Sequence, residues 1–248
     1  MAEKDKTKEG LDPRFIDVDP LKKSYRESII EHPDRPEAIK GKNIALLCID
    51  MQYLDAAEGH GVFADIAHSG IPAEAQQYYF NALKKTVLPN VRKLQDCFRD
   101  HHHEVIHIRI QSLTLNGRDR SNAHKRLGLL ATPGSKEAEF LEEVAPKKDE
   151  IIVNKTSSGV FTSSNLYYVL KNLEIDSLWV TGVYTEECVS TTVRDASDLG
   201  FFVTLIEDGC TSVTPERHDF TIATLRDRYT RILTTRQALD EIEEHSPV

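Results

Sequence analysis

The chain has 248 residues, of which 40% are hydrophobic, and its formal net charge is -9. That length and apolar content can form one large core, so we expect a single α/β domain. The acidic balance excludes a basic nucleic-acid-binding surface, and no apolar run approaches the ~20 residues that a bilayer-spanning helix needs.

The first 40 residues are polar and contain several prolines, at Pro13, Pro20, Pro33 and Pro36. This composition predicts an N-terminal extension over residues 1–40, either disordered or draped over the domain or a partner subunit. The start of the chain also lacks the apolar segment of a signal peptide. We expect the folded domain to span residues 41–248.

Six short runs of apolar and β-branched residues follow, and they are typical of strands buried on both faces. These runs are Ile44–Asp50, Glu104–Ile110, Glu150–Lys155, Ser177–Val183, Phe202–Asp208 and Arg231–Thr235. Helical patterns lie between them, at Ala75–Arg99, Ser135–Val144, Ser164–Leu173, Cys188–Leu199 and His218–Asp227. Strands that alternate with helices predict right-handed βαβ units. The expected fold is a three-layer α/β/α domain around a doubly wound, six-stranded, mostly parallel sheet.

Three side chains that could take part in catalysis fall at the carboxyl ends of the expected strands. Asp50 and Lys155 end two of these strands, and Cys188 follows the turn after a third. Ligands of doubly wound sheets bind beyond the carboxyl ends of the strands. We therefore expect these three residues to share one site.

Cys188 lies where a strand turns sharply into a helix. Free N–H groups at a helix start favour negative charge, so the turn is expected to ease deprotonation of the thiol. The alternative is a small buried packing residue. Glu186 and Glu187 precede the cysteine, and we expect them to point outward from the first helical turn.

Asp50 and Lys155 could each have a purely structural role. Asp50 could cap a helix or loop, and Lys155 could be a solvated residue at the end of a strand. Together with Cys188 they form a charge-balanced set of carboxylate, ammonium and thiol. A carboxylate can move the proton of the thiol, and the ammonium can keep both groups ionised. The combination favours covalent hydrolysis through a cysteine nucleophile.

Three motifs in consistent order carry a resemblance to a known family: Ile49-Asp50-Met-Gln52, Lys155-Thr-Ser-Ser-Gly-Val-Phe161 and Gly182-Val-Tyr-Thr-Glu-Glu-Cys188-Val, followed by Thr192 and Asp195. Residues 42–240 resemble the isochorismatase-like cysteine hydrolases. The resemblance implies that Asp50, Lys155 and Cys188 form the catalytic triad. It also implies a cis peptide bond at Val183–Tyr184 and an oxyanion hole made by the backbone N–H groups of Tyr184 and Cys188.

The resemblance further favours one branch of that family. Nicotinamidases carry an Asp-x-His metal motif after the second strand, and residues 111–121 contain no such motif, so neither a metal nor another cofactor is expected. The segments Arg118-Asp-Arg-Ser, Lys155-Thr-Ser-Ser and Glu207-Asp-Gly-Cys resemble the ureide-hydrolysing branch, which includes ureidoacrylate, biuret and N-carbamoylsarcosine amidohydrolases. The chain departs from the usual family start, because it has Tyr53-Leu-Asp55 where Asn-Asp-Phe is common.

We therefore expect an amidohydrolase that cleaves a C–N bond of a small ureide, N-carbamoyl or amide substrate through a thioester. Gln52, Arg109, Gln111 and Tyr184 are the candidate substrate-binding residues. Two alternatives remain open, an isochorismatase-type vinyl-ether hydrolase and a non-catalytic regulatory or scaffold member of the fold.

The four cysteines are widely spaced and form no CxxC motif. This usage favours a reduced, cytoplasmic setting over a disulfide framework. The resemblance also implies a homo-oligomer, either a dimer or a tetramer. The acidic charge and the lack of a long apolar run predict no nucleic-acid or membrane partner.

Overall fold

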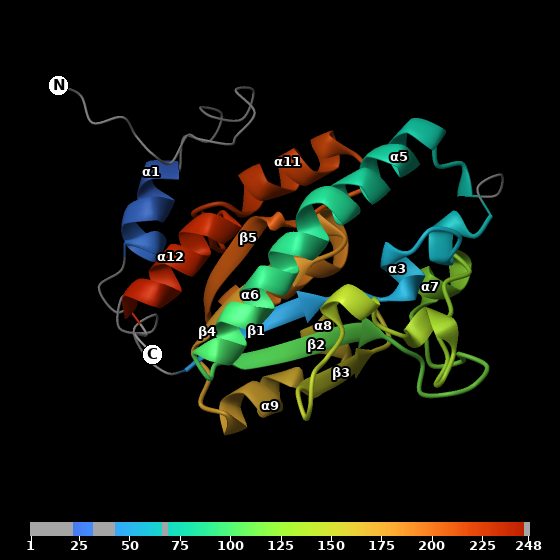
Figure 1. Ribbon diagram of the computed structural model, residues 1–248, viewed down its shortest axis with the longest axis horizontal. Helices are drawn as coiled ribbons and strands as arrows, with labels where there is room; N and C mark the ends of the chain where they lie inside the picture. Colours follow the sequence, from blue (N-terminus) through green and yellow to red (C-terminus); the bar gives the residue numbers. More distant parts are fainter. Residues whose placement is uncertain (1–21, 32–42, 66–68, 246–248) are drawn as a thin grey trace.

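A six-stranded sheet forms the centre of the protein in the computed structural model, which describes residues 22–31, 43–65 and 69–245. The strand order is β3-β2-β1-β4-β5-β6, and every paired neighbour is parallel (Figure 1). The strands are β1 Ile44–Ile49, β2 Glu104–Ile110, β3 Ile151–Lys155, β4 Ser177–Gly182, β5 Phe202–Cys210 and β6 Arg231–Leu233. The predicted α/β architecture is confirmed, and the sheet is entirely parallel.

The two central strands, β1 and β4, are buried along their whole length. Successive side chains of a strand point to opposite faces of the sheet, so each strand contributes side chains to both hydrophobic cores. Leu47 and Val180 belong to the core on one face of the sheet. Leu46 and Trp179 belong to the core on the other. A continuous apolar run is therefore required at these positions, which is why the strands are readable in the sequence.

Helices cover both faces of the sheet (Figure 1). The core on one face includes side chains of α6 and α12, and the core on the other includes side chains of α9, α10 and α11. The helices are α1 Lys22–Tyr25, α3 Tyr53–Ala56, α5 Ala73–Ala82, α6 Leu88–Asp100, α7 Asn122–Arg126, α8 Val160–Ser163, α9 Leu166–Asn172, α10 Ser190–Asp198, α11 Pro215–Leu225 and α12 Thr235–His245. Shorter 3₁₀ or π turns are η3 Arg26–Ile30, η4 Gly61–Phe63, η5 Leu83–Val87, η6 Lys136–Ala138, η7 Glu142–Val144 and η8 Thr185–Val189.

The expected helix over residues 135–144 is wrong. The segment forms only η6 and η7, and Phe140 between them pairs with Gln52 in an antiparallel bridge. Backbone hydrogen bonds also join Tyr53 N–H to Glu139 O and Leu141 N–H to Met51 O, at 2.9 and 3.0 Å. These groups are satisfied by the loop after β1, so the backbone cannot also form a continuous helix.

Most of the expected N-terminal extension lies outside the described residues. Its described part, α1 and η3, contacts the domain of its own chain, because the Arg228 guanidinium lies 5.7 Å from the centre of the Tyr25 ring. Within the described residues, no helix combines the length and apolarity needed to cross a bilayer.

Candidate active site

The carboxyl ends of β1, β3 and β4 deliver the three expected side chains to one edge of the sheet. Asp50 directly follows β1, Lys155 is the last residue of β3, and Cys188 lies in η8 after β4. Asp50 adopts a left-handed backbone conformation (φ 53°), and its N–H donates to Ile108 O at 2.9 Å. The chain thus turns at Asp50 while still hydrogen-bonded to the sheet.

Gly182 allows the chain to leave β4 against the neighbouring strand. Its φ is 120°, and a Cβ at this position would lie 2.0 Å from the carbonyl oxygen of Ile49. Only glycine tolerates both the conformation and the close approach. The next residue returns to β1, because Val183 N–H donates to Ile49 O at 3.0 Å. Gly182 therefore fixes the direction in which the Cys188 turn starts.

Lys155 joins the other two side chains. Its Nζ lies 2.8 Å from Asp50 Oδ2 and 3.2 Å from Cys188 Sγ. A third contact runs to the carbonyl oxygen of Ser157 at 3.1 Å. Lys155 therefore donates two hydrogen bonds and forms an ion pair with Asp50. Lys155 and Asp50 are fully buried and Cys188 is 4% exposed, so the three predicted residues form one water-poor cluster.

Electrostatics in this cluster keep the thiol protonated at rest. Burial raises the pKa of Cys188 well above its ordinary value, and the nearby Asp50 carboxylate raises it further, while Lys155 opposes both effects. Burial also raises the pKa of Asp50, against the opposing charge of Lys155. For Lys155, burial lowers the pKa but the charges of Asp50 and Cys188 outweigh it and raise it. The expectation of an easily deprotonated thiol is therefore wrong for the resting site, because burial and the Asp50 charge raise the pKa of Cys188 more than Lys155 lowers it.

The turn before Cys188 has the cis peptide bond at Val183–Tyr184 that the family resemblance implied. Thr185 N–H donates to Thr211 O at 3.0 Å, which ties the turn to the end of β5. On the other side, Tyr184 Oη donates to the carbonyl oxygen of Asp55 at 3.1 Å. The turn is thus held between two neighbouring segments.

A cavity of about 160 Å³ opens beside the Cys188 thiol. That space suits a small molecule, since one water occupies ~30 Å³ in the liquid. One part of the wall is apolar and another part carries polar or charged groups. The lining residues are Asp55, Val62, Ile71, Ile110, His124, Leu127, Leu129, Tyr184, Glu186, Glu187, Cys188, Val213 and Arg217.

Acidic side chains in this wall were not anticipated. Glu186 and Glu187 were expected to point outward; Glu187 is exposed as expected and borders the cavity mouth, whereas Glu186 is part-buried in the wall. Glu186 is held there by Arg217, whose Nε lies 2.8 Å from Glu186 Oε1. Asp55 is 5% exposed and also faces the cavity. The departure at Tyr53-Leu-Asp55 was the one sequence signal that could have marked it.

His124 is a further buried member of the wall that the sequence did not reveal. Burial lowers its pKa to about 4, and the charges of Lys155 and Arg120 add to this effect. Its Nδ1 is buried and has no hydrogen-bond partner. The imidazole is therefore neutral at ordinary pH and has a nitrogen available to a bound molecule.

Three of the four expected substrate-binding side chains lie outside the cavity wall and bind other protein groups. Gln52 is fully buried, its Nε2 donates to two carbonyl oxygens, and its Oε1 accepts from Ile110 N–H at 2.6 Å. Arg109 donates to Asn154 Oδ1 at 2.8 Å and to Gln111 Oε1 at 3.2 Å. Neither these two nor Gln111 lines the cavity. Gln52 and Arg109 brace the loops around the site, whereas Tyr184 does line the cavity.

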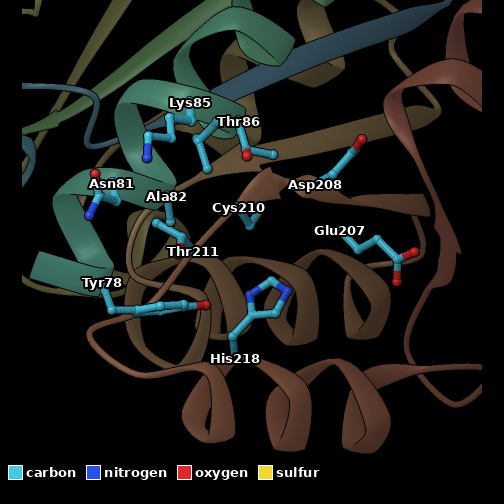
Figure 2. A pocket seen from close by; sticks show the side chains of 11 residues that line it. Tyr78, Asn81, Ala82, Lys85, Thr86, Glu207, Asp208, Cys210, Thr211 and His218 are labelled. Atoms are coloured by element: carbon cyan, nitrogen blue, oxygen red, sulfur yellow. The ribbon is translucent and has the colours of Figure 1, made fainter. Parts of the chain in front are cut away.

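A second cavity, of about 410 Å³, is lined by residues of α5, η5, the end of β5 and α11 (Figure 2). Figure 2 shows Tyr78 and Lys85 from the α5–η5 helix on one wall and His218 from α11 on another. Burial lowers the pKa of His218 to about 4, and its Nδ1 hydrogen-bonds with Thr185 Oγ1 at 2.8 Å. This cavity holds none of the three catalytic candidates, so its clearest link to the site is support of the η8 turn.

Metal-ligand side chains are not grouped in the part of the chain that the structure describes. No three His, Cys, Asp or Glu side chains there could hold one ion together.

Comparisons with known proteins identify the family and the fold. The Isochorismatase domain family matches residues 44–237. An uncharacterized isochorismatase family protein, YrdC of Bacillus subtilis, is 35% identical over 111 residues, which cover 40% of this chain and 59% of that protein. Ureidoacrylate amidohydrolase RutB of Rhizobium rhizogenes is 27% identical over 77% of this chain and 80% of its own length. A cysteine hydrolase from Pseudomonas syringae has a similar fold, with a TM-score of 0.69 at 21% identity, over 82% of this chain and 94% of its own.

Proposed function

The chain belongs to the isochorismatase family, and on that premise we propose that it is a cysteine amidohydrolase that cleaves a C–N bond of a small ureide or amide. One observation carries the proposal. Lys155 Nζ contacts both Asp50 Oδ2 and Cys188 Sγ, at 2.8 and 3.2 Å, beside a cavity of about 160 Å³. A packing cysteine needs neither a buried ion pair nor a cavity. The similarity to ureidoacrylate amidohydrolase RutB supports a ureide as the substrate.

The reaction starts from the protonated thiol. As Cys188 Sγ attacks the substrate carbonyl carbon, the thiol proton passes to Asp50. The raised pKa of the buried carboxylate makes it a better proton acceptor than an exposed aspartate. Lys155 remains charged and stabilises the anionic sulfur during the transfer. The coupled transfer avoids a free thiolate in a buried site.

The attack produces a tetrahedral intermediate whose oxygen carries the negative charge. We assign the backbone N–H groups of Tyr184 and Cys188 as its donors. Donors of this kind, already in place before the reaction, lower a barrier by about 3–4 kcal/mol each in a known hydrolase.

Asp50 then returns the proton to the leaving nitrogen as the C–N bond breaks. The amine or ammonia departs, and the carbonyl carbon stays on sulfur as a thioester, or as a thiocarbamate when the substrate is a ureide. Asp50 next takes a proton from a water molecule, whose oxygen attacks the carbonyl carbon. The C–S bond breaks, the acid or carbamate product leaves, and Asp50 returns the proton to Sγ, which restores the thiol. No redox partner is required, because every proton and electron pair stays within these groups.

Ammonia release from a substrate panel tests the proposal. The panel contains ureidoacrylate, biuret, N-carbamoyl amino acids and nicotinamide, assayed with the wild type, Cys188→Ala and a matched control, Cys97→Ala. Cys97 is only half-buried and lies in α6, so its loss should leave turnover unchanged. We expect at least one ureide or amide to be hydrolysed, and Cys188→Ala to abolish its turnover without unfolding the protein. A folded wild type inactive on the whole panel would favour the vinyl-ether hydrolase or the scaffold.

We also propose a cytoplasmic homo-oligomer, a dimer or tetramer. All four cysteines are free, which supports a reducing compartment. Light scattering on the purified protein tests the assembly, and a monomer at micromolar concentration would contradict it.

A further inference from the structure

Asp55 is a buried carboxyl group beside the proposed nucleophile whose chemistry the proposed reaction does not use. Its side chain faces the cavity, it is 5% exposed, and its Oδ2 has no hydrogen-bond partner. Leaving such an oxygen without a partner is unfavourable, because its hydration is lost and nothing replaces it. A buried, unpartnered oxygen aimed into a cavity indicates that a bound molecule supplies the partner.

The backbone holds Asp55 firmly in this position. Its carbonyl oxygen accepts hydrogen bonds from Tyr79 Oη at 2.7 Å and from Tyr184 Oη at 3.1 Å. The two rings also contact each other, with centres 5.2 Å apart. Two buried tyrosines therefore fix α3 against the Cys188 turn, and the Asp55 carboxyl keeps a constant place relative to the thiol.

The positive groups near this wall are already paired. Lys155 forms an ion pair with Asp50 and donates to Cys188 Sγ and the Ser157 carbonyl. Arg217 pairs with Glu186 at 2.8 Å and is 54% exposed. His124 is neutral at ordinary pH because burial lowers its pKa to about 4. Among the described residues that line the cavity, every cationic side chain is therefore already paired or neutral.

Negative and neutral groups dominate the surroundings of Asp55. Burial raises its pKa well above the ordinary value, Asp50 and Glu187 raise it further, and Lys155 opposes them. In either protonation state the carboxyl accepts a hydrogen bond from an N–H group. A second carboxylate placed beside the ionised form of Asp55 meets like charge in a poorly solvated site, which is strongly unfavourable.

We infer that Asp55 selects the substrate by accepting N–H donors from the part of the molecule that is not cleaved. The inference rests on the proposed function and narrows its substrate class. The preferred substrate is a neutral or cationic ureide or amide with N–H groups next to the scissile carbonyl and no carboxylate there. This class differs from an anionic N-carbamoyl acid.

Alkylation of Cys188 tests this charge selection without requiring turnover. Iodoacetamide and iodoacetate are nearly the same size, and only iodoacetate brings a carboxylate into the cavity. Rates at pH 8.5 are read by peptide mass spectrometry, and the same cysteine in urea-unfolded protein supplies the reference ratio. We expect the folded protein to prefer iodoacetamide by at least about tenfold over that reference.

The variant Asp55→Asn keeps the shape of the side chain and removes its charge, and it should lower this preference at least about threefold. Glu58→Gln is the matched control. Glu58 lies three positions after Asp55 in the chain but outside the cavity wall, so the variant removes a nearby negative charge without changing the cavity. We expect the control to keep the wild-type ratio. The inference is overturned if the ratio survives Asp55→Asn, or if both variants shift it equally.

Two substrates provide a second readout. N-carbamoylglycinamide should be hydrolysed with at least about tenfold higher kcat/KM than N-carbamoylglycine, and Asp55→Asn should narrow that gap. Equal turnover of both by the wild type would overturn the inference and leave the proposed nucleophile intact. A Cys188 that neither reagent modifies in the folded protein would instead contradict the proposed function itself.

Discussion

Replacement of Lys155 by methionine tests how the buried cluster is held together. The substitution keeps most of the side-chain volume and removes the ammonium that contacts Asp50 at 2.8 Å and Cys188 at 3.2 Å. Removing one partner of a buried ion pair usually costs about 3–5 kcal/mol, because the other charge stays buried without compensation. We expect the free energy of unfolding of Lys155→Met to fall by that amount at pH 8, and we expect the variant to lose its hydrolytic activity.

The loss should depend on pH with a definite sign. Without Lys155, the pKa of Asp50 in the folded protein rises further, because the group that lowered it is gone and burial remains. The folded state then binds the Asp50 proton more tightly than the unfolded state, so stability falls as pH increases above the ordinary carboxyl pKa of 3.8. The cost of Lys155→Met should therefore be smaller at pH 5 than at pH 8.

Urea unfolding at both pH values measures this cost. The double variant Lys155→Met/Asp50→Asn is the control. It also removes the Asp50 carboxylate, which would otherwise stay buried without a partner, and should regain most of the stability at pH 8. A single variant within 1 kcal/mol of wild type at pH 8, with no pH dependence, would show that the pair behaves as an exposed salt bridge. That outcome would refute the reasoning.

Three further outcomes follow from the geometry. Asp55→Asn should become more stable relative to wild type as pH rises above 3.8. The raised pKa of Asp55 means that folded wild type binds the Asp55 proton more tightly than the unfolded chain, so wild type loses stability as that proton dissociates. A constant difference between the two proteins in urea unfolding from pH 4 to 8 would contradict this. Gly182→Ala should destabilise the fold and abolish hydrolysis, because its Cβ would lie 2.0 Å from Ile49 O. In the control Gly200→Ala the Cβ has no atom within 4 Å, so the free energy of unfolding should fall by only about 1–2 kcal/mol. Equal melting temperatures for the two variants would be inconsistent with the close approach. The alkylation rate of Cys188 should keep rising up to pH 9 because its pKa is raised above 9.0, and a plateau below pH 7 would reveal a thiolate at rest.

The sheet could be predicted because burial on both faces forces a continuous apolar run. Ile44–Ile49 is buried at every position, and such a run differs plainly from an amphipathic helix. Asp50 and Lys155 stand out for the same reason, since each is a charged residue at the end of such a run. Parallel topology then places them at one edge of the sheet, as the 2.8 Å contact confirms.

Side-chain partners across the site were not predictable in the same way. Gln52 follows Asp50 closely and suggested a substrate contact, yet its amide bonds to backbone groups of Ile110 and Glu137, which are distant in sequence. The direction of Glu186 depends on Arg217 in another helix. α12 was missed because its buried side is short, with Ala238 and Ile242 as its buried apolar side chains. These features arise from tertiary contacts that no local pattern encodes.

Trapping the covalent intermediate tests the central claim most directly. The enzyme is mixed with a substrate from the active panel, quenched in acid during turnover, and analysed by intact-protein and peptide mass spectrometry. We predict an acyl or carbamoyl mass on Cys188 that is absent from Cys188→Ala. Undiminished hydrolysis by Cys188→Ala, with no adduct on the wild-type residue, would contradict a cysteine nucleophile in this site.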